Sequence, residues 1–221
     1  MKSVLVTAGS TMVPIDRVRA ITNIFKGRTG TNIALYFAQQ GWKVKLITSN
    51  PSLLEGKHCE GLSTEAFHTY CDLFCAMKSS ICSDEKYDAI VHSAAVSDYR
   101  VQGTFVYEPE RGMQIVGSNG KISSSFDELY LRLVPTQKIV DLIREHWGYE
   151  GYLVKFKLQT MMSDEQLLKI AEESRVHSKA EMMVANCLEW SNERAFVMTE
   201  GRAVPVARAN LPEAIMKGIG L

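Results

Sequence analysis

Short apolar runs alternate with amphipathic segments over the first 95 residues of the chain. Continuous apolar runs predict strands of a parallel sheet, because such strands are covered on both faces. These strands are expected at 3–7, 42–48, about 61–67 and 88–93. Segment 28–40 predicts a helix with Ile33, Tyr36 and Phe37 on its apolar side and Gly41 at its end. Another helix is expected after the third strand, extending to about residue 80. This order is typical of a doubly wound parallel sheet.

Residues 97–127 interrupt the alternation, because they hold many turn formers and little periodicity. A segment of this length inside a compact domain predicts a functional loop or flap. The alternation then resumes, with strands expected at 128–134, 152–157 and 181–185 and helices at 136–146, 163–177 and 211–219. The turn Glu200-Gly201-Arg202 between 196–199 and 203–206 predicts a hairpin. We therefore expect one α/β domain over residues 1–221: a Rossmann-like, doubly wound, mostly parallel sheet with a long central flap (about 100–127) and a C-terminal hairpin.

Composition narrows the classes of function. The chain has 25 Lys and Arg and 25 Asp and Glu, so its formal net charge is zero. This removes the electrostatic argument for a nucleic-acid partner or a polybasic membrane surface. No apolar run approaches the ~20 residues of a membrane span, and the run after Met1 is short for a signal peptide. Five cysteines, an odd number, indicate reduced thiols, so a cytoplasmic protein is expected.

Candidate chemistry lies where the first and fourth expected strands end, at 7–11 and 93–99, because ligands of open α/β sheets bind at the carboxyl ends of strands. Small residues there let backbone N–H groups approach a phosphate. Neither a Walker loop nor a G-x-G-x-x-G fingerprint occurs, and Gly27 and Gly30 resemble only the last part of the latter. No tyrosine has a lysine four residues later, which disfavours a short-chain dehydrogenase, and no G-x-S-x-G elbow appears. A site without a nucleophile favours substrates that react with each other while the protein positions them and neutralises charge.

Several segments together resemble phosphopantothenoylcysteine synthetase over nearly the whole chain. In order they are Thr7-Ala8-Gly9-Ser10-Thr11, Pro14-Ile15-Asp16-Arg17-Val18-Arg19, Ile21-Thr22-Asn23, Gly27-Arg28-Thr29-Gly30, Ala94-Ala95-Val96-Ser97-Asp98-Tyr99, Lys121-Ile122-Ser123-Ser124, Phe156-Lys157-Leu158 and Val184-Ala185-Asn186. The resemblance implies a ligase of coenzyme A biosynthesis that joins 4′-phosphopantothenate to L-cysteine through an acyl-nucleotide formed with CTP or ATP. The lysine motif, and a chain too short for a flavin decarboxylase domain, favour the stand-alone form of the enzyme.

The resemblance also implies residue roles. Catalytic roles fall on Asn23, whose amide contacts the acyl group, and on Lys121, which neutralises phosphate charge. Substrate contacts fall on Asn23, Arg19, Gly27 and Gly30. Nucleotide contacts fall on Gly9, Ser10, Thr11, Ala94, Ala95, Asp98, Lys121, Gln137, Lys138, Ile139, Val140 and Phe156. Four of these residues have a structural alternative: Asn23 as a turn cap, Asp98 as an N-cap, Lys121 as a solvated loop lysine and Phe156 as a core residue.

The resemblance implies Mg²⁺, with ligands that it does not identify, and CTP or ATP as co-substrate, with CTP favoured. It also implies a homodimer, in which the flap lies near the partner subunit.

Some residues depart from the family pattern. Ser10 replaces a glycine, and Cys187 replaces the aspartate that usually follows Asn186. Glu173 and His177 stand where helix lysines are common, with Arg175 or Lys179 as possible substitutes. These departures bear on the phosphate contacts and leave open a nucleotide-binding relative without catalysis. The Rossmann-like sheet leaves open an NAD(P)-dependent reductase, which the missing tyrosine–lysine pair disfavours.

Overall fold

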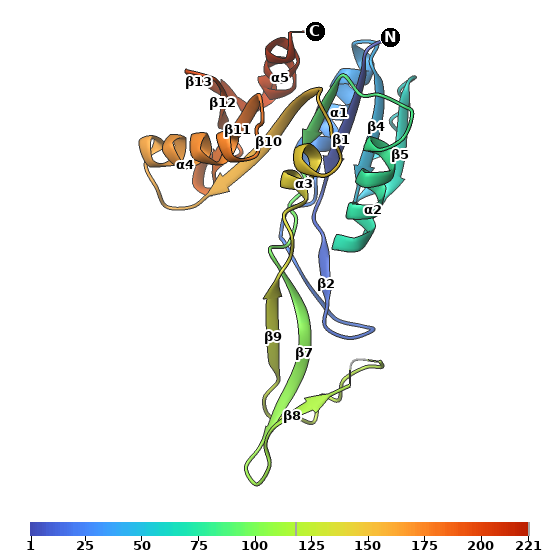
Figure 1. The fold of residues 1–221 in the computed structure, drawn as a ribbon, viewed down its shortest axis with the longest axis vertical. Coiled ribbons are helices and arrows are strands. Elements are labelled where there is room, and N and C mark those ends of the chain that lie inside the picture. Colours follow the sequence, from blue (N-terminus) through green and yellow to red (C-terminus); the bar gives the residue numbers. More distant parts are fainter. Residues whose placement is uncertain (118, 221) are drawn as a thin grey trace.

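The computed structural model describes residues 1–117 and 119–220. Its centre is an eight-stranded sheet of order β13-β12-β11-β10-β6-β1-β4-β5 (Figure 1). The strands of this sheet are β1 (Ser3–Ala8), β4 (Lys43–Thr48), β5 (Leu62–Ala66), β6 (Ala89–His92), β10 (Tyr152–Gln159), β11 (Met182–Cys187), β12 (Arg194–Thr199) and β13 (Arg202–Ala207). The first six run parallel, and β12 and β13 pair antiparallel at one edge. The mostly parallel, doubly wound sheet and the C-terminal hairpin are thus confirmed.

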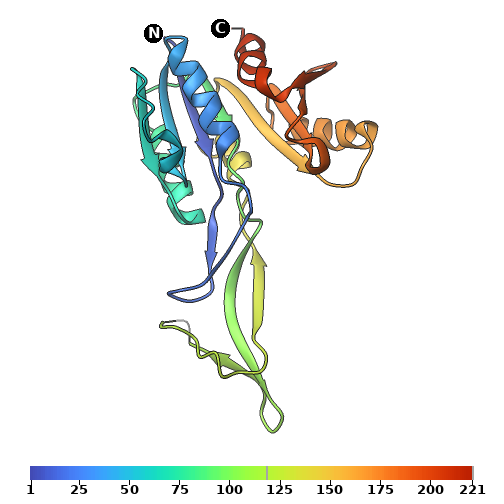
Figure 2. The same cartoon turned by 180° about the vertical axis from the view of Figure 1, so that it is seen from behind.

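Helices cover both faces of the sheet. On one face lie α1 (Arg28–Gln39) and α5 (Leu211–Ile219), which contact each other (Figure 2). On the other face lie α2 (Tyr70–Ile81), α3 (Ile139–Glu145) and α4 (Asp164–His177). Alternate residues of one strand serve opposite layers: Val4 and Val6 pack in the cluster that contains α1, and Leu5 packs in the cluster that contains α2 and α3. This explains why β1 is a continuous apolar run, since all six of its residues are buried.

The helices that begin with a side-chain cap could be placed well from sequence. Thr69 and Asp72 form a capping box at the start of α2, and Ser163 and Gln166 form one at the start of α4. Helix α1 differs, because Gly27 precedes it in a left-handed conformation and makes no side-chain cap. The positive end of α1 is therefore left available to other groups.

Much of segment 97–127, which was expected to form a loop or flap, consists of paired strands. Strands β7 (Tyr99–Glu108) and β8 (Gly112–Val116) pair with each other, and β7 also pairs with β9 (Tyr130–Pro135). The three strands form an antiparallel arm that extends away from the central sheet (Figure 1). A separate ribbon of β2 (Met12–Pro14) and β3 (Ala20–Thr22), which the sequence did not predict, contacts the arm through β2.

Within the described part of the chain, none of the helices combines the length and the apolar character that a membrane span requires.

Candidate active site

The connections after β1 and β6 meet at the point where the chain order of the sheet reverses. The N–H of Ala95 donates to the carbonyl of Gly9 at 2.8 Å, and the N–H of Thr11 donates to the carbonyl of Ala95 at 3.2 Å. The Thr11 hydroxyl is buried and accepts from the N–H of Ser97 at 2.9 Å. The two loops are thereby joined into one platform at the carboxyl ends of the strands, where open α/β sheets bind ligands.

A first cavity of about 510 Å³ lies between this platform, the start of α3 and helix α4. Its walls include Phe156, Ile139, Val140 and Ile170, so a planar apolar ring can pack there. Seven of the residues assigned to nucleotide binding line it: Ala94, Asp98, Gln137, Lys138, Ile139, Val140 and Phe156. The segment 137–140 lies at a helix start, as expected, because Lys138 is the N-cap of α3 and the helix begins at Ile139.

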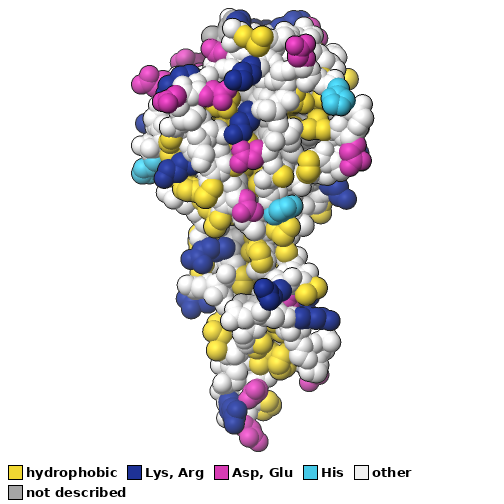
Figure 3. All heavy atoms as spheres, turned by 90° about the vertical axis from the view of Figure 1, so that its right-hand side faces the viewer, with side chains coloured by type: hydrophobic (Ala, Val, Ile, Leu, Met, Phe, Trp, Pro, Cys, Tyr) yellow, Lys and Arg dark blue, Asp and Glu magenta, His cyan; other side chains and the backbone are white. Residues whose placement is uncertain are grey.

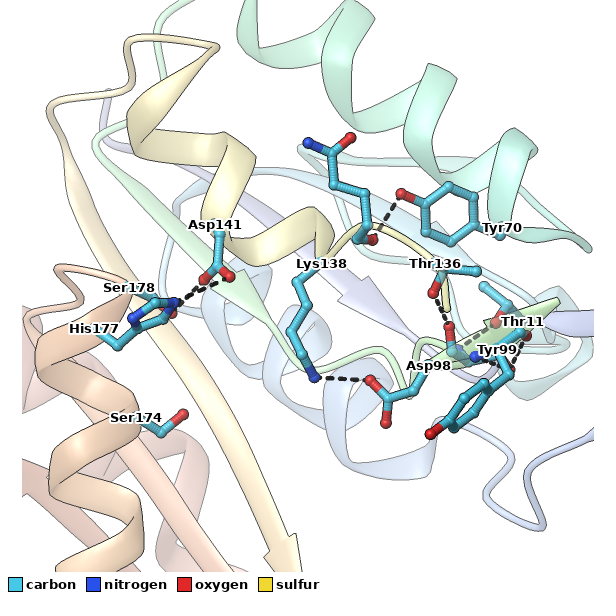
Figure 4. Close-up of polar contacts among 12 residues, drawn as sticks. Thr11, Tyr70, Asp98, Tyr99, Thr136, Lys138, Asp141, Ser174, His177 and Ser178 are labelled. Carbon is cyan, nitrogen blue, oxygen red and sulfur yellow. Dashed lines mark hydrogen bonds and ion pairs between the residues drawn. The ribbon is translucent and has the colours of Figure 1, made fainter. Parts of the chain in front are cut away.

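Polar groups from three elements face this cavity, as Figure 4 shows. Lys138 donates to Asp98 at 2.8 Å, which ties the start of α3 to the platform. Asp141 of α3 accepts from the hydroxyl of Ser178 at 2.7 Å, and the imidazole of His177 lies 3.4 Å from its other carboxylate oxygen. Since Ser178 and His177 are at the end of α4, Asp141 connects two helices across the cavity.

Two buried basic residues lie behind these groups, side by side on adjacent strands. Lys155 of β10 is in register with His92 of β6, and both line the first cavity. Burial, together with the nearby Lys155 charge, lowers the pKa of His92 to about 4, so this imidazole is neutral at physiological pH. Its Nδ1 lies 2.9 Å from the Thr7 hydroxyl. Burial also lowers the pKa of Lys155 to about 8, although Asp141 opposes the shift.

A second cavity of about 690 Å³ adjoins the first, and Ala94, Val96, Asp98, Phe156 and Lys157 line both. The first turn of α1 opens into it. Gly27 makes this possible, because a Cβ there would lie 2.4 Å from the Gly9 nitrogen. Gly30 packs similarly closely, since its Cβ would lie 2.7 Å from that of Ala8. Both glycines, to which the resemblance assigns substrate contacts, line this cavity, and their lack of a side chain lets the start of α1 pack against β1.

The second cavity is electropositive at this end. Lys26 and Arg28 line it beside the uncapped start of α1, whose first turn contains no acidic residue. Arg208 also lines it and donates to Asn186 at 3.0 Å and to the hydroxyl of Thr29. These two partners are uncharged, so the guanidinium retains a full positive charge in the cavity. Such a combination of cations and a helix N-terminus suits a phosphate group.

Asn23 lies in the second cavity and its amide donates to the carbonyl of Ala95 at 3.3 Å. Gly9 and Ala95 line the same cavity. Ser10 and Thr11 line neither of the two cavities. The hydroxyl of Ser10 instead lies 3.2 Å from that of Thr22, and Ser10 forms an isolated β-bridge with Ala95 of the connection after β6, so it ties the β2–β3 ribbon to the platform.

Arg19 and Lys121 are likewise outside both cavities. Asp16 accepts from Arg19 at 2.5 Å and from the N–H of Ile122 at 3.0 Å, and Arg19 donates to the carbonyl of Ile122 at 2.7 Å. The Arg19 guanidinium, with these N–H donors, holds the pKa of Asp16 well below its usual range. This pair fixes the backbone next to Lys121, while Lys121 itself is exposed.

Sequence reasoning missed several residues that line the cavities, namely His92, Asp141, Lys155, Ser174, Ser178, Asn192 and Arg208. One signal was available for Lys155, because a lysine inside the buried run 153–156 is unusual. Glu173 and His177, the departures on α4, do line the first cavity. Arg175 does not substitute for a cavity cation, since it turns inward to Glu172 and to the carbonyl of Ala180.

Across residues 1–117 and 119–220, no cluster of three or more His, Cys, Asp or Glu side chains forms a ready metal site. Asp98 is the carboxylate that lines both cavities. Mg²⁺ is commonly held by one or two carboxylates together with substrate phosphates. The residues present therefore fit an ion that arrives with a nucleotide, and Asp98 is the side chain placed to meet it.

Comparisons with known proteins show which family the chain resembles and which solved fold it shares. Residues 1–215 match the family described as DNA/pantothenate metabolism flavoprotein C-terminal domain. The chain is 33% identical over 210 residues to the coenzyme A biosynthesis bifunctional protein CoaBC of Thermococcus kodakarensis. The match covers 94% of this chain and 45% of that protein. It thus spans less than half the length of this relative.

Two further proteins are similar over more of their own length. Phosphopantothenate–cysteine ligase 1 of Oryza sativa subsp. japonica is 22% identical over 248 residues, covering 94% of this chain and 75% of that enzyme. The crystal structure of the DNA/pantothenate metabolism flavoprotein from Streptococcus pneumoniae superimposes with a TM-score of 0.85 at 27% identity. That match covers 100% of this chain and 98% of the other.

Proposed function

Because the chain belongs to the DNA/pantothenate metabolism flavoprotein C-terminal domain family, we propose that it is a ligase of coenzyme A biosynthesis that joins 4′-phosphopantothenate to L-cysteine. The observation that carries this proposal is the junction of two cavities at Ala94 and Val96, with the amide of Asn23 beside it. One cavity suits a nucleotide and the other suits a phosphorylated acid. Two substrates bound in this way meet without a protein nucleophile.

The first step activates the acid. The carboxylate of phosphopantothenate attacks the α-phosphorus of the nucleotide, a P–O bond forms, and pyrophosphate leaves. In the second step the cysteine amine attacks the acyl carbon, an amide forms, and the nucleoside monophosphate leaves with the bonding electron pair. In this proposal the amide of Asn23 contacts the acyl group, and the first turn of α1 with Arg208 holds the substrate's own phosphate; all of these residues line the second cavity.

We expect CTP to be the preferred nucleotide, with ATP as the competing choice. Cytosine discrimination needs acceptors for its exocyclic amine and donors for its carbonyl oxygen O2 and its ring nitrogen N3. Residues 137–140, whose backbone groups would supply them, line the cavity that would hold the base. A mispaired buried polar edge costs about 1–3 kcal/mol, which corresponds to roughly 5- to 150-fold discrimination. When bound with the nucleotide near Asp98, Mg²⁺ would supply neutralisation of phosphate charge.

A homodimer is also part of the proposal, and the arm supports it. Figure 3 shows hydrophobic side chains on the narrow lower part of the molecule. The exposed apolar residues of the arm are Tyr99, Tyr107, Met113, Ile115, Tyr130 and Leu133. Since Lys121 lines neither cavity of its own chain, a second copy is a route by which a flap lysine reaches a cavity. Sedimentation should give twice the 24.7 kDa of one chain at micromolar concentration, and a monomer would refute this part.

Turnover assays test the ligase directly. Purified protein is incubated with phosphopantothenate, L-cysteine, Mg²⁺ and either CTP or ATP, while pyrophosphate is measured and the amide product is identified by mass spectrometry. Pyrophosphate release should require phosphopantothenate, and kcat/KM should be higher with CTP. No turnover with either nucleotide would refute the ligase, and nucleotide binding without turnover would indicate a relative that has lost catalysis. A higher kcat/KM with ATP would overturn only the choice of base.

A further inference from the structure

A buried lysine forms part of the floor of the first cavity. The side chain of Lys155 enters from β10 in the central sheet, and the residue is 6% exposed. Its Nζ donates to the carbonyl of Ser174 at 3.0 Å, to the hydroxyl of Ser174 at 3.1 Å and to the hydroxyl of Ser178 at 2.6 Å. All three acceptors are uncharged. An ammonium taken out of water is costly unless a negative group compensates it, so this lysine requires an explanation.

The protein only partly compensates the positive charge of Lys155. Asp141 lies beyond Ser178, whose hydroxyl donates to the carboxylate at 2.7 Å, so a hydroxyl group separates the two charges. That carboxylate is also shared with His177, and Asp98 is paired with Lys138. The carbonyl of Ser174 adds the partial negative charge of the end of α4. The charged and titratable groups around Lys155 are His92 of β6, Lys138 and Asp141 at α3, Lys157 of β10, and Glu173 and His177 of α4.

The lysine keeps its proton at neutral pH under these conditions. Burial lowers its pKa to about 8, and the charges of Lys157 and Lys138 add to this effect while that of Asp141 opposes it. Its neighbour His92 is neutral, because burial and Lys155 lower the pKa of that imidazole to about 4. The cavity floor therefore presents one fixed positive charge, oriented by two serines of α4, beneath apolar walls.

We propose that Lys155 is a nucleotide-binding residue, whose ammonium donates a charged hydrogen bond to an acceptor oxygen of the nucleotide in the first cavity. This rests on the proposed function, because it assigns the first cavity to the nucleotide. The acceptor chemistry is shared by the carbonyl of a pyrimidine base and by phosphate oxygens. Ser174 and Ser178 are positioning residues: they hold the ammonium in place and do not themselves need to contact the nucleotide.

Calorimetric binding tests this proposal without requiring turnover. Lys155→Met replaces the ammonium with a neutral chain of similar length, and Lys169→Met, an exposed lysine of α4, is the matched control. We expect the Kd for CTP to rise on the order of 10- to 100-fold in Lys155→Met, as for loss of a charged hydrogen bond, and to stay unchanged in Lys169→Met. If the acceptor is the base carbonyl, the variant should bind cytidine more weakly, in parallel with CTP. If the acceptor is a phosphate oxygen, the variant should bind inorganic tripolyphosphate more weakly and cytidine with unchanged affinity.

Two readouts separate this role from a structural one. In steady-state assays Lys155→Met should raise KM for the nucleotide and leave KM for phosphopantothenate and cysteine within about threefold. In the unmodified protein, CTP binding should weaken between pH 7.5 and 9.5, as the ammonium with a pKa of about 8 loses its proton. The pH series serves even when the variant does not fold.

The outcomes distinguish this inference from the proposed function. An unchanged Kd for CTP in a folded Lys155→Met, or equal losses for all three substrates, would overturn the role of Lys155 and leave the ligase intact. Nucleotide binding that depends on Lys155 without turnover would overturn the ligase and leave the inference standing. If the unmodified protein binds neither CTP nor ATP, the inference is overturned.

Discussion

Replacement of Gly27 by alanine should disturb both stability and the second cavity. Gly27 has φ +84°, and an added Cβ would lie 2.4 Å from the nitrogen and 2.8 Å from the Cα of Gly9. These are backbone atoms at the end of β1, so they cannot move away as a flexible side chain would. Gly41 offers a matched control, because it has φ +80° and nothing lies within 4 Å of the position of its Cβ.

Both variants carry the cost of left-handed backbone, and Gly27→Ala alone carries a steric cost as well. Left-handed backbone at a non-glycine residue costs about 1–2 kcal/mol in either variant. Steric overpacking adds about 1–3 kcal/mol for Gly27→Ala alone, so its total is about 2–5 kcal/mol. For a chain of this size each kcal/mol lowers Tm by about 2–4 °C. We expect Gly27→Ala to lower kcat/KM as well, because the start of α1 must shift away from the cavity.

Urea unfolding with linear extrapolation measures the difference in the free energy of unfolding, and initial rates measure the effect on turnover. Gly41→Ala should retain the kcat/KM of the unmodified protein. Equal losses of stability in the two variants would show that the close approach of Gly27 to Gly9 carries no steric cost, and the packing argument for this loop would then be wrong.

Three further outcomes are expected. Lys121→Ala should lower kcat on the order of 10²-fold with little change in the urea midpoint, and near-normal turnover would mean that Lys121 is only a solvated lysine. Asn23→Asp should let the acyl-nucleotide accumulate in quenched reactions analysed by mass spectrometry, because a negative charge beside the acyl group impairs the second step. The pKa of His92 is about 4 in the folded protein and about 6.5 when unfolded, so its contribution to stability is complete above pH 6.5 and declines as the pH falls toward 4. Between pH 8 and pH 5 the free energy of unfolding, measured with urea, should fall by about 2 kcal/mol. A His92→Gln variant with the same pH dependence would show that His92 is not the group responsible.

The central sheet was predictable because its strands are buried on both faces. Such strands appear as continuous apolar runs between helices, and β1, β6 and β11 are buried throughout. The arm was missed for the opposite reason. Strand β7 contains Gly103 at a register shift with β9, and exposed residues interrupt its apolar positions. Thr104 and Val106 are the buried residues of this strand, and two buried positions leave no sustained hydrophobic period in the sequence.

The candidate site divides in the same way. The residues assigned by local motifs each belong to one short segment of the chain, and Asp98, Phe156 and Asn23 do line the cavities. Contacts made between separate elements were not visible. Lys155 and Ser178 are 23 residues apart and meet only because α4 packs back along β10 and β11. Linear spacing contains no information about such a pairing, although the lysine within a buried strand was a usable sign.

The position of the two cavities follows from the order of the strands. The connections after β1 and β6 diverge to opposite faces of the sheet, so a cavity forms on each side of the platform that they share. The α1 side supplies a helix N-terminus and Arg208, while the α3 and α4 side supplies apolar walls and the ammonium of Lys155. Each side therefore has its own means of holding an anion, and the two cavities join where Ala94, Val96, Asp98, Phe156 and Lys157 line both, with the amide of Asn23 beside them. That separation suits a reaction between two bound phosphorylated substrates, because their charges are held apart while the carboxylate and the α-phosphate approach each other.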